Sequence, residues 1–308
     1  MTSAQHEAVV TMLENEPRRG DTTLDAMRKG YDRGLLAFRP ADGTTTRVVT
    51  CNGVGIHLVS GPGASTDRTL LFVHGGGYVL GSPPAYYELA GRISTACGAQ
   101  VAVVDYRRAP EAPAPAARHD VHRAYAWLLE NGADASRTGL IGDSAGGGLA
   151  LLVAAQLGRG DLPAPAAVVA LSPWIDLSVG PDFPDESAVA DPMLTREGLR
   201  WFAGTYLGGA RADNPEHNAL HADLSALPPA LLQSGPRDIT HADAGAFAER
   251  ARAAGAEVVV EVSPGLVHNW HAFGPDLPEG HAALARVGEF LAGRWTASST
   301  DSSRPEGV

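Results

Sequence analysis

Residues 138–157 read TGLIGDSAGGGLALLVAAQL, and this stretch decides the fold class. Its first part, Thr138–Asp143, is short and apolar, as expected of a buried strand. Its second part, Ala145–Leu157, is a longer run of small and apolar residues that predicts a helix. Ser144 stands between them in the pattern G-x-S-x-G, where small residues let the chain turn sharply and expose the hydroxyl. The stretch therefore predicts a strand, a tight turn carrying a candidate nucleophile, and a helix whose positive N-terminus faces it.

Apolar runs and helical patterns alternate along the rest of the chain. Two helices are predicted at residues 3–15 and 22–38, followed by a hairpin whose turn is Asn52-Gly53. Strands are predicted at Arg47–Cys51, Gly55–Val59, Thr69–Val73, Gln100–Asp105, Ala166–Leu171, Ala230–Ser234 and Glu257–Val262. Further helices are predicted at Tyr86–Cys97, Pro115–Asn131, Ala242–Ala254 and His281–Trp295. This alternation predicts an α/β fold with a mostly parallel central sheet flanked by helices.

Residues 175–225 interrupt the alternation with prolines and aromatic residues, and the interruption is too long for an ordinary connection. Together with the N-terminal helices, we interpret it as a helical cap over the carboxyl ends of the strands. The predicted division is N-terminal cap helices at 1–45, a catalytic α/β domain at 46–179 and 226–295, a cap insertion at 180–225, and a Ser/Thr-rich tail at 296–308 that is expected to be disordered.

The composition argues against several classes of function. The chain has 308 residues, a formal net charge of -11 and no Lys/Arg-rich block, so no nucleic-acid partner is expected. No stretch approaches the roughly 18 apolar residues of a membrane span, and the N-terminus does not resemble a secretory signal. We therefore expect no stable membrane anchor and a cytoplasmic location. Two cysteines, Cys51 and Cys97, do not indicate a disulfide framework.

A second glycine-rich stretch follows an earlier strand. Phe72–Tyr78 reads FVHGGGY, and its successive glycines let backbone N–H groups turn toward a ligand without a side chain in the way. Such an element is the partner of the nucleophile turn in esterases. We predict an oxyanion hole formed by the amides of Gly76, Gly77 and Ala145. A phosphate cradle is disfavoured because the Lys and Ser/Thr of a P-loop are missing.

The base and the acid are predicted from their places in the strand order. A serine nucleophile of this type is followed by the acid and then the histidine. Asp238 follows a predicted strand and enters a turn, and His268 stands between the last strand and the last helix. We predict that they complete a triad with Ser144, Asp238 orienting the imidazole. His271 and Asp243 are the rivals for these two roles.

Together these motifs resemble the bacterial hormone-sensitive-lipase-like esterases, or family IV lipolytic enzymes, of the α/β-hydrolase superfamily. The matching pieces span about residues 70–275 and are His74–Tyr78, Asp105–Glu111, Gly142–Gly147, Ser172–Asp176, Asp191–Leu194 and the segments of Asp238 and His268. The resemblance implies an α/β-hydrolase sheet with a helical cap. It implies hydrolysis of short to medium acyl esters through an acyl-enzyme, without metal or organic cofactor, and is compatible with a homodimer formed at the sheet edge. It also implies that Asp105–Glu111 supports the site structurally.

The sequence departs from the family pattern at three places. Arg108 stands where the family usually has Leu, and Leu266 where it often has Met. Neither should disable the triad. His271 is an extra imidazole that could tune the pocket or contact substrate.

Aromatic residues are candidates for lining a substrate pocket beneath the cap. They are Phe38, Tyr78, Trp174, Trp201, Phe202, Tyr206 and Trp270. For each of them, packing between cap and core is the alternative. Asp185, Glu186 and Asp191 are interpreted as solvated loop charges rather than ligands.

Other functions fit parts of the pattern. A metal site could use His119 with His122 or His217 with His221, but neither pair has the H-E-x-x-H arrangement, so surface histidines are preferred. A non-catalytic small-molecule binding protein is disfavoured because all three triad residues are present. The same triad could also serve a deacetylase or amidase, or an acyl-transfer enzyme of a biosynthetic pathway.

Overall fold

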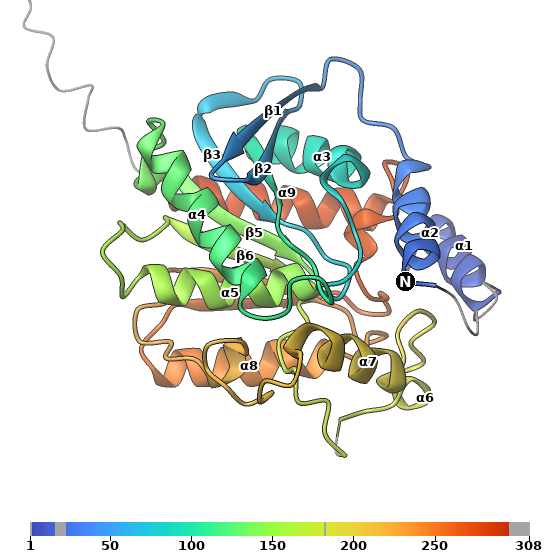
Figure 1. The fold of residues 1–308 in the computed structure, drawn as a ribbon. Helices are drawn as coiled ribbons and strands as arrows, with labels where there is room; N and C mark the ends of the chain where they lie inside the picture. Colours follow the sequence, from blue (N-terminus) through green and yellow to red (C-terminus); the bar gives the residue numbers. More distant parts are fainter. Residues whose placement is uncertain (1, 16–22, 182, 296–308) are drawn as a thin grey trace, which may run out of the picture.

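The computed structural model describes residues 2–15, 23–181 and 183–295. Within them, eight strands form one sheet in the order β1-β2-β4-β3-β5-β6-β7-β8 (Figure 1). The strands are β1 Thr45–Cys51, β2 Val54–Ser60, β3 Ser65–Val73, β4 Ala99–Asp105, β5 Thr138–Asp143, β6 Ala167–Leu171, β7 Ala230–Ser234 and β8 Val258–Val262. The predicted disordered tail, 296–308, lies outside the described residues.

The sheet is parallel except at its first edge. β1 and β2 form a hairpin in which Cys51 pairs with Val54 across the two-residue turn Asn52-Gly53. Both turn residues have positive φ, 46° and 85°, which is the conformation that an Asn-Gly hairpin turn requires. β2 continues antiparallel to β4, and the pairs from β4 to β8 are parallel. The predicted mostly parallel sheet is confirmed.

Two helical layers cover the sheet because its strands carry apolar side chains on both faces. Leu140 of β5 packs into the cluster that contains residues of α4, α5 and α8, whereas its neighbour Ile141 packs on the opposite side with residues of α3 and α9. The main helices are α3 Tyr87–Cys97, α4 Ala116–Glu130, α5 Ala145–Leu157, α8 His241–Ala253 and α9 Pro278–Ala292. The α/β-hydrolase architecture expected from the motifs is therefore present.

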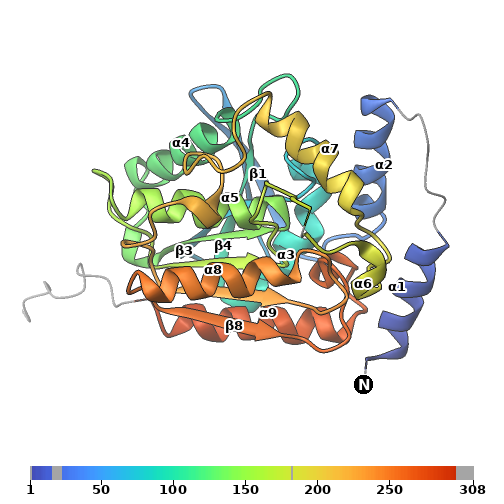
Figure 2. The same cartoon turned by 90° about the horizontal axis from the view of Figure 1, so that it is seen from below.

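Four further helices lie together at one side of the molecule, as both views show (Figures 1 and 2). They are α1 Ala4–Glu14, α2 Leu24–Leu36, α6 Glu186–Val189 and α7 Arg196–Leu207. The aromatic ring of Phe202 in α7 lies against Gly77, just beyond the carboxyl end of β3. These helices therefore stand beside the strand ends that carry the candidate site. None of the helices in the described ranges is both long enough and apolar enough to cross a membrane.

Candidate active site

Ser144 sits in a strained turn between β5 and α5. Its φ of 53° and ψ of -124° lie in a region that non-glycine residues rarely adopt. The turn is held by two backbone hydrogen bonds, from Ser144 N to Leu171 O at 2.9 Å and from Trp174 N to Ser144 O at 3.0 Å. A Cβ on Gly146 would clash with the carbonyl oxygen of Val73, which explains the glycine at this place in the motif. The local sequence therefore forces the hydroxyl out of the sheet.

The structure brings Ser144, His268 and Asp238 into one hydrogen-bonded chain. His268 Nε2 lies 2.9 Å from Ser144 Oγ, and His268 Nδ1 lies 2.7 Å from Asp238 Oδ2. The other carboxylate oxygen of Asp238 accepts from the backbone N–H and the hydroxyl of Thr240, both at 2.8 Å. Asp238 follows β7 and His268 follows β8, and because these strands are parallel neighbours their ends meet at one edge. The expected placement after successive strands is therefore observed.

Electrostatics favour a histidine that can hold a proton. Burial of His268 opposes its protonation, but the charge of Asp238 and the hydrogen bond to it act in the other direction, and the net pKa is raised above 6.5. The side chains of both residues are almost fully buried. The imidazolium is therefore stabilised by a neighbouring carboxylate rather than by water.

The glycine segment after β3, residues 75–77, has backbone N–H groups available as donors near the hydrogen-bonded residues Ser144, His268 and Asp238. Gly76 and Gly77 have positive φ values of 100° and 63°, and the carbonyl of Gly76 accepts from the amides of Val79 at 3.1 Å and Leu80 at 2.8 Å. In the described part of the chain, the amides of Gly76, Gly77 and Ala145 donate to no other protein group. These amides are the three donors predicted from the sequence, and their role as an oxyanion hole remains a prediction.

Asp143, which precedes the serine, was not predicted as a site residue. Its Oδ1 accepts from Gly75 N at 2.8 Å, and its Oδ2 accepts from Asn269 Nδ2 at 2.7 Å and from the hydroxyl of Tyr86 at 3.3 Å. Burial raises the pKa of Asp143 to about 6, although these hydrogen bonds lower it. Asp143 therefore links the serine turn, the glycine segment and the residue after His268. The only sequence feature that could have identified Asp143 is its position as the variable residue before the serine in G-x-S-x-G.

The two rivals have other partners. His271 is buried, its Nε2 lies 3.0 Å from Gln233 Oε1, and its ring stacks on Trp270. Burial lowers the pKa of His271 to about 3, so it stays neutral. Asp243 Oδ2 accepts from the amides of Ile175 and Asp176, both at 2.9 Å. Neither His271 nor Asp243 forms a hydrogen bond with Ser144, His268 or Asp238.

One interpretation of a loop charge was wrong. Asp191 is only 4% exposed, so it is not a solvated charge. Its carboxylate accepts from the amides of Met193, Leu194 and Ile239 at 2.8 to 2.9 Å. Asp191 therefore fastens the segment before α7 to the turn that carries Asp238. Asp185 is exposed, and it caps α6 as a loop charge would.

The predicted pocket-lining aromatic residues fall into distinct places. Tyr78 and Tyr206 stack with centroids 3.9 Å apart, and Trp174 lies 6.0 Å from Tyr78, all three buried. Trp270 is fully buried against Leu266 and Leu277. Phe38 packs against Gly274, and Trp201 is 44% exposed with its ring edge-on to that of Phe202. Phe202 lies against Gly77, one of the glycines predicted to form the oxyanion hole.

Neither histidine pair is accompanied by further ligands. Across residues 2–15, 23–181 and 183–295, no three His, Cys, Asp or Glu side chains gather as metal ligands would. His119 Nε2 lies 3.1 Å from a guanidinium nitrogen of Arg118. Cys51 and Cys97 are both buried and unpaired.

Comparisons with known proteins agree with this architecture. Residues 70–272 match the model of a family described as having the alpha/beta hydrolase fold. The chain is 38% identical to an acetyl-hydrolase of Streptomyces hygroscopicus, covering 94% of this chain and 97% of that protein. It is 32% identical to the carboxylesterase/phospholipase LipF of Mycobacterium tuberculosis, covering 84% and 72%.

Solved structures are similar over nearly the whole chain. The crystal structure of an esterase from the bacterial hormone-sensitive lipase family superposes with a TM-score of 0.91 at 39% identity, covering 96% of this chain and 100% of that one. Another hormone-sensitive lipase, from a metagenome library, superposes with a TM-score of 0.90 at 30% identity and the same coverage. The chain therefore belongs to the α/β-hydrolase-fold family, within its bacterial hormone-sensitive-lipase group of esterases.

Proposed function

We propose that the chain hydrolyses carboxylic esters by nucleophilic catalysis through Ser144, His268 and Asp238. The observation that carries the proposal is the continuous hydrogen-bonded chain, 2.9 Å from Ser144 to His268 and 2.7 Å from His268 to Asp238. A base within hydrogen-bonding distance of a hydroxyl, itself oriented by a carboxylate, is the arrangement that activates a serine.

The reaction has two halves. In the first, His268 takes the proton of Ser144 as its Oγ bonds to the ester carbonyl carbon, and the carbonyl electrons move to oxygen. The tetrahedral oxyanion accepts hydrogen bonds from Gly76, Gly77 and Ala145. Its collapse breaks the bond to the leaving alkoxide, which receives the proton from His268 as an alcohol. In the second half, water repeats these steps on the acyl-enzyme, releasing the acid and restoring Ser144.

We propose small acyl esters, acetyl esters among them, as substrates. Similar proteins include the Streptomyces acetyl-hydrolase and an ethyl acetate hydrolase of Pseudomonas putida, 33% identical over 74% of this chain. The ring of Phe202 against Gly77 supports the same choice, because it occupies space beside the predicted oxyanion hole. Rates on p-nitrophenyl acetate, butyrate and octanoate, run beside acetanilide as an amide, test both acyl size and ester preference. Equal rates on the amide would contradict the ester assignment.

Truncating Phe202 is expected to shift acyl preference toward longer chains. Phe202→Ala removes the ring that packs on Gly77, so the ratio of kcat/KM for octanoate to that for acetate should rise about tenfold, the order expected for one apolar pocket contact. Met193→Ala is the control, because Met193 is in the same predicted cap insertion but is 38% exposed. An unchanged ratio in Phe202→Ala would remove this residue from the pocket.

The pH dependence follows from the protonation state of His268. The base must be neutral, so kcat/KM should fall as pH decreases through the pKa of His268, which lies above 6.5. Asp143, with a pKa of about 6, takes up a second proton at lower pH and loses charge-assisted hydrogen bonds from Gly75 and Asn269. A plot of log(kcat/KM) against pH should therefore steepen toward a slope of two below pH 6. A single slope of one down to pH 4 would show that Asp143 need not be ionised.

A further inference from the structure

Helix α2 turns a polar face toward the segment that follows the oxyanion glycines. Arg28 and Asp32 are four residues apart, so they share one side of the helix. Arg28 Nε donates to the carbonyl of Val79 at 2.9 Å, and Asp32 Oδ2 accepts from the hydroxyl of Ser82 at 2.7 Å. Two side chains of one helix therefore bind both ends of a four-residue stretch, 79–82.

Arg28 is itself held in place by further partners. Its Nη2 donates to the carbonyl of Ala109 at 2.9 Å, and the guanidinium pairs with both carboxylate oxygens of Glu111 at 2.7 Å. The hydrogen bond from Arg28 lowers the pKa of Glu111 to about 2, so the pair stays ionised at the pH of any ordinary assay. The planar guanidinium is thus fixed by a two-pronged contact on one side and by carbonyls on the other.

Tyr31, three residues after Arg28, extends the same face to the base of the serine turn. Its hydroxyl lies 2.6 Å from that of Tyr86, which lies 3.3 Å from Asp143 Oδ2. We call Arg28, Tyr31 and Asp32 the α2 latch. Through this face, α2 contacts Val79 and Ser82 directly. It reaches Asp143, the residue before Ser144, through Tyr86.

The glycine segment needs such restraints because its backbone is strained. Positive φ values occur at Gly76, Gly77, Tyr78 and Gly81, and the 63° of Tyr78 is costly for a bulky residue. Strained backbone persists only where its surroundings over-determine it. The carbonyl of Tyr78 is tied to the amide of Ala109 at 3.0 Å, and the next carbonyl, that of Val79, is tied by Arg28.

We propose that the α2 latch positions residues 75–82 and so keeps the amides of Gly76 and Gly77 aimed at the developing oxyanion. This inference rests on the proposed function, which assigns those amides their role. Arg28 bonds to Val79, Ala109 and Glu111 and not to Ser144 or His268, so it acts as a positioning residue. Without it, the segment between Gly77 and Ser82 relaxes and the donors diverge from the oxyanion.

Arg28→Gln is expected to lower kcat about tenfold per active site while leaving KM within about twofold, because only transition-state hydrogen bonds weaken. Active sites are counted by titration with a fluorophosphonate, which separates slower turnover from a smaller folded fraction. A trifluoromethyl ketone, which Ser144 attacks to form a tetrahedral oxyanion adduct, should bind about tenfold more weakly, in proportion to the loss in kcat/KM.

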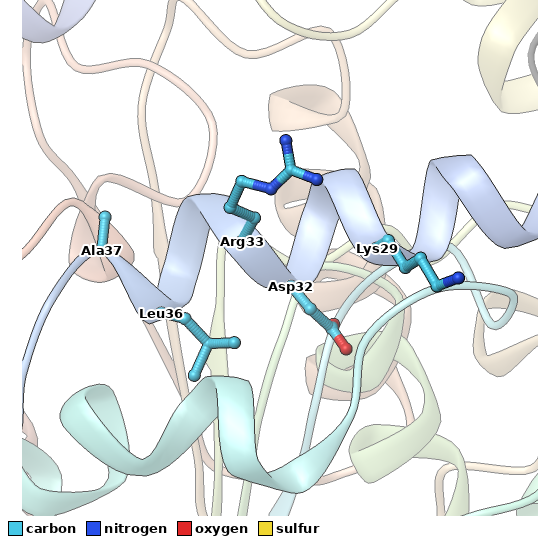
Figure 3. Close-up of a pocket in the computed structure, with 5 residues that line it drawn as sticks. All are labelled: Lys29, Asp32, Arg33, Leu36 and Ala37. Carbon is cyan, nitrogen blue, oxygen red and sulfur yellow. The ribbon is translucent and has the colours of Figure 1, made fainter.

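Arg33→Gln is the matched control on the same helix. Arg33 lines a pocket of about 610 Å³ with Lys29, Asp32, Leu36 and Ala37, and in Figure 3 its side chain points to the opposite side of α2 from Asp32 and Leu36. The same chemical change there should leave kcat and ketone affinity at wild-type values. If Arg28→Gln matches Arg33→Gln in both readouts, the latch does not position the segment.

Two further measurements decide the remaining outcomes. If Arg28→Gln does not fold, Tyr31→Phe removes a single hydroxyl and should still lower kcat and ketone affinity together. Unchanged values overturn the proposal.

If the wild-type chain hydrolyses no ester, the proposed function fails, and amide hydrogen exchange tests the α2 latch independently of activity. Peptides covering residues 75–82 should exchange faster in Arg28→Gln than in Arg33→Gln, and equal exchange contradicts the latch.

Discussion

Replacing Ser144 by alanine is expected to lower kcat for ester hydrolysis by about 10⁴- to 10⁶-fold, the range seen when a triad nucleophile is removed. The hydroxyl 2.9 Å from His268 Nε2 is the group that forms the acyl-enzyme in the proposed mechanism, and no other serine or threonine hydroxyl in the described residues bonds to this imidazole. The measurement is the rate on p-nitrophenyl acetate, together with labelling by a fluorophosphonate followed by mass spectrometry.

The fold of Ser144→Ala should be unaffected. Alanine differs from serine by one oxygen, and the backbone strain at this position is the same for both residues, so the melting temperature should stay within about 2 °C of wild type. Ser178→Ala, on an exposed loop, is the control and should retain both rate and labelling. Wild-type turnover in Ser144→Ala, or a label on a different residue, would refute the proposed nucleophile.

The fold could be predicted from the sequence because its strands are short apolar runs and its turns carry strong local signals. β5 and α5 begin and end where the pattern around Ser144 placed them, and the Asn52-Gly53 turn joins two antiparallel strands as predicted. Helix α9 was misplaced by three residues at its start, because Pro278 occupies the first turn and the apolar period begins later. Local patterning therefore fixes element type better than element boundaries.

The supporting residues of the site could not be predicted, because their partners are distant in the sequence. Asp143 bonds to Asn269, 126 residues later, and Arg28 bonds to Glu111, 83 residues later. An aspartate in a strand-end turn looks the same whether it faces solvent or a buried amide. The interpretation of Asp191 as a solvated loop charge is wrong for the same reason, because nothing in the local sequence shows that its carboxylate is buried on backbone amides. Such contacts depend on tertiary packing, which local patterns do not encode.

Asp238→Asn is expected to reduce kcat/KM by about 10⁴-fold, as when the carboxylate of a triad is neutralised in a serine protease. The carboxylate accepts from His268 Nδ1 at 2.7 Å, so Nε2 remains free to accept the serine proton. An asparagine can donate its amide N–H to Nδ1 and thereby place the imidazole proton on Nε2, where it cannot act as a base. The apparent pKa of the acid limb should also fall, because the charge of Asp238 contributes to the raised pKa of His268.

Asp243→Asn is the control for Asp238→Asn. It shows whether activity depends on the Asp238 carboxylate in particular or on any buried aspartate nearby. Asp243 is five residues away and buried, and it accepts from the amides of Ile175 and Asp176 instead of from an imidazole. Burial raises its pKa to about 7, so near neutral pH the substitution removes only part of a charge. Activity should therefore stay within about threefold of wild type, since surrounding bonds to an acceptor oxygen can be kept. If Asp243→Asn proved as damaging as Asp238→Asn, the imidazole would not depend on the 2.7 Å bond that the geometry singles out, and the assignment of Asp238 would fail.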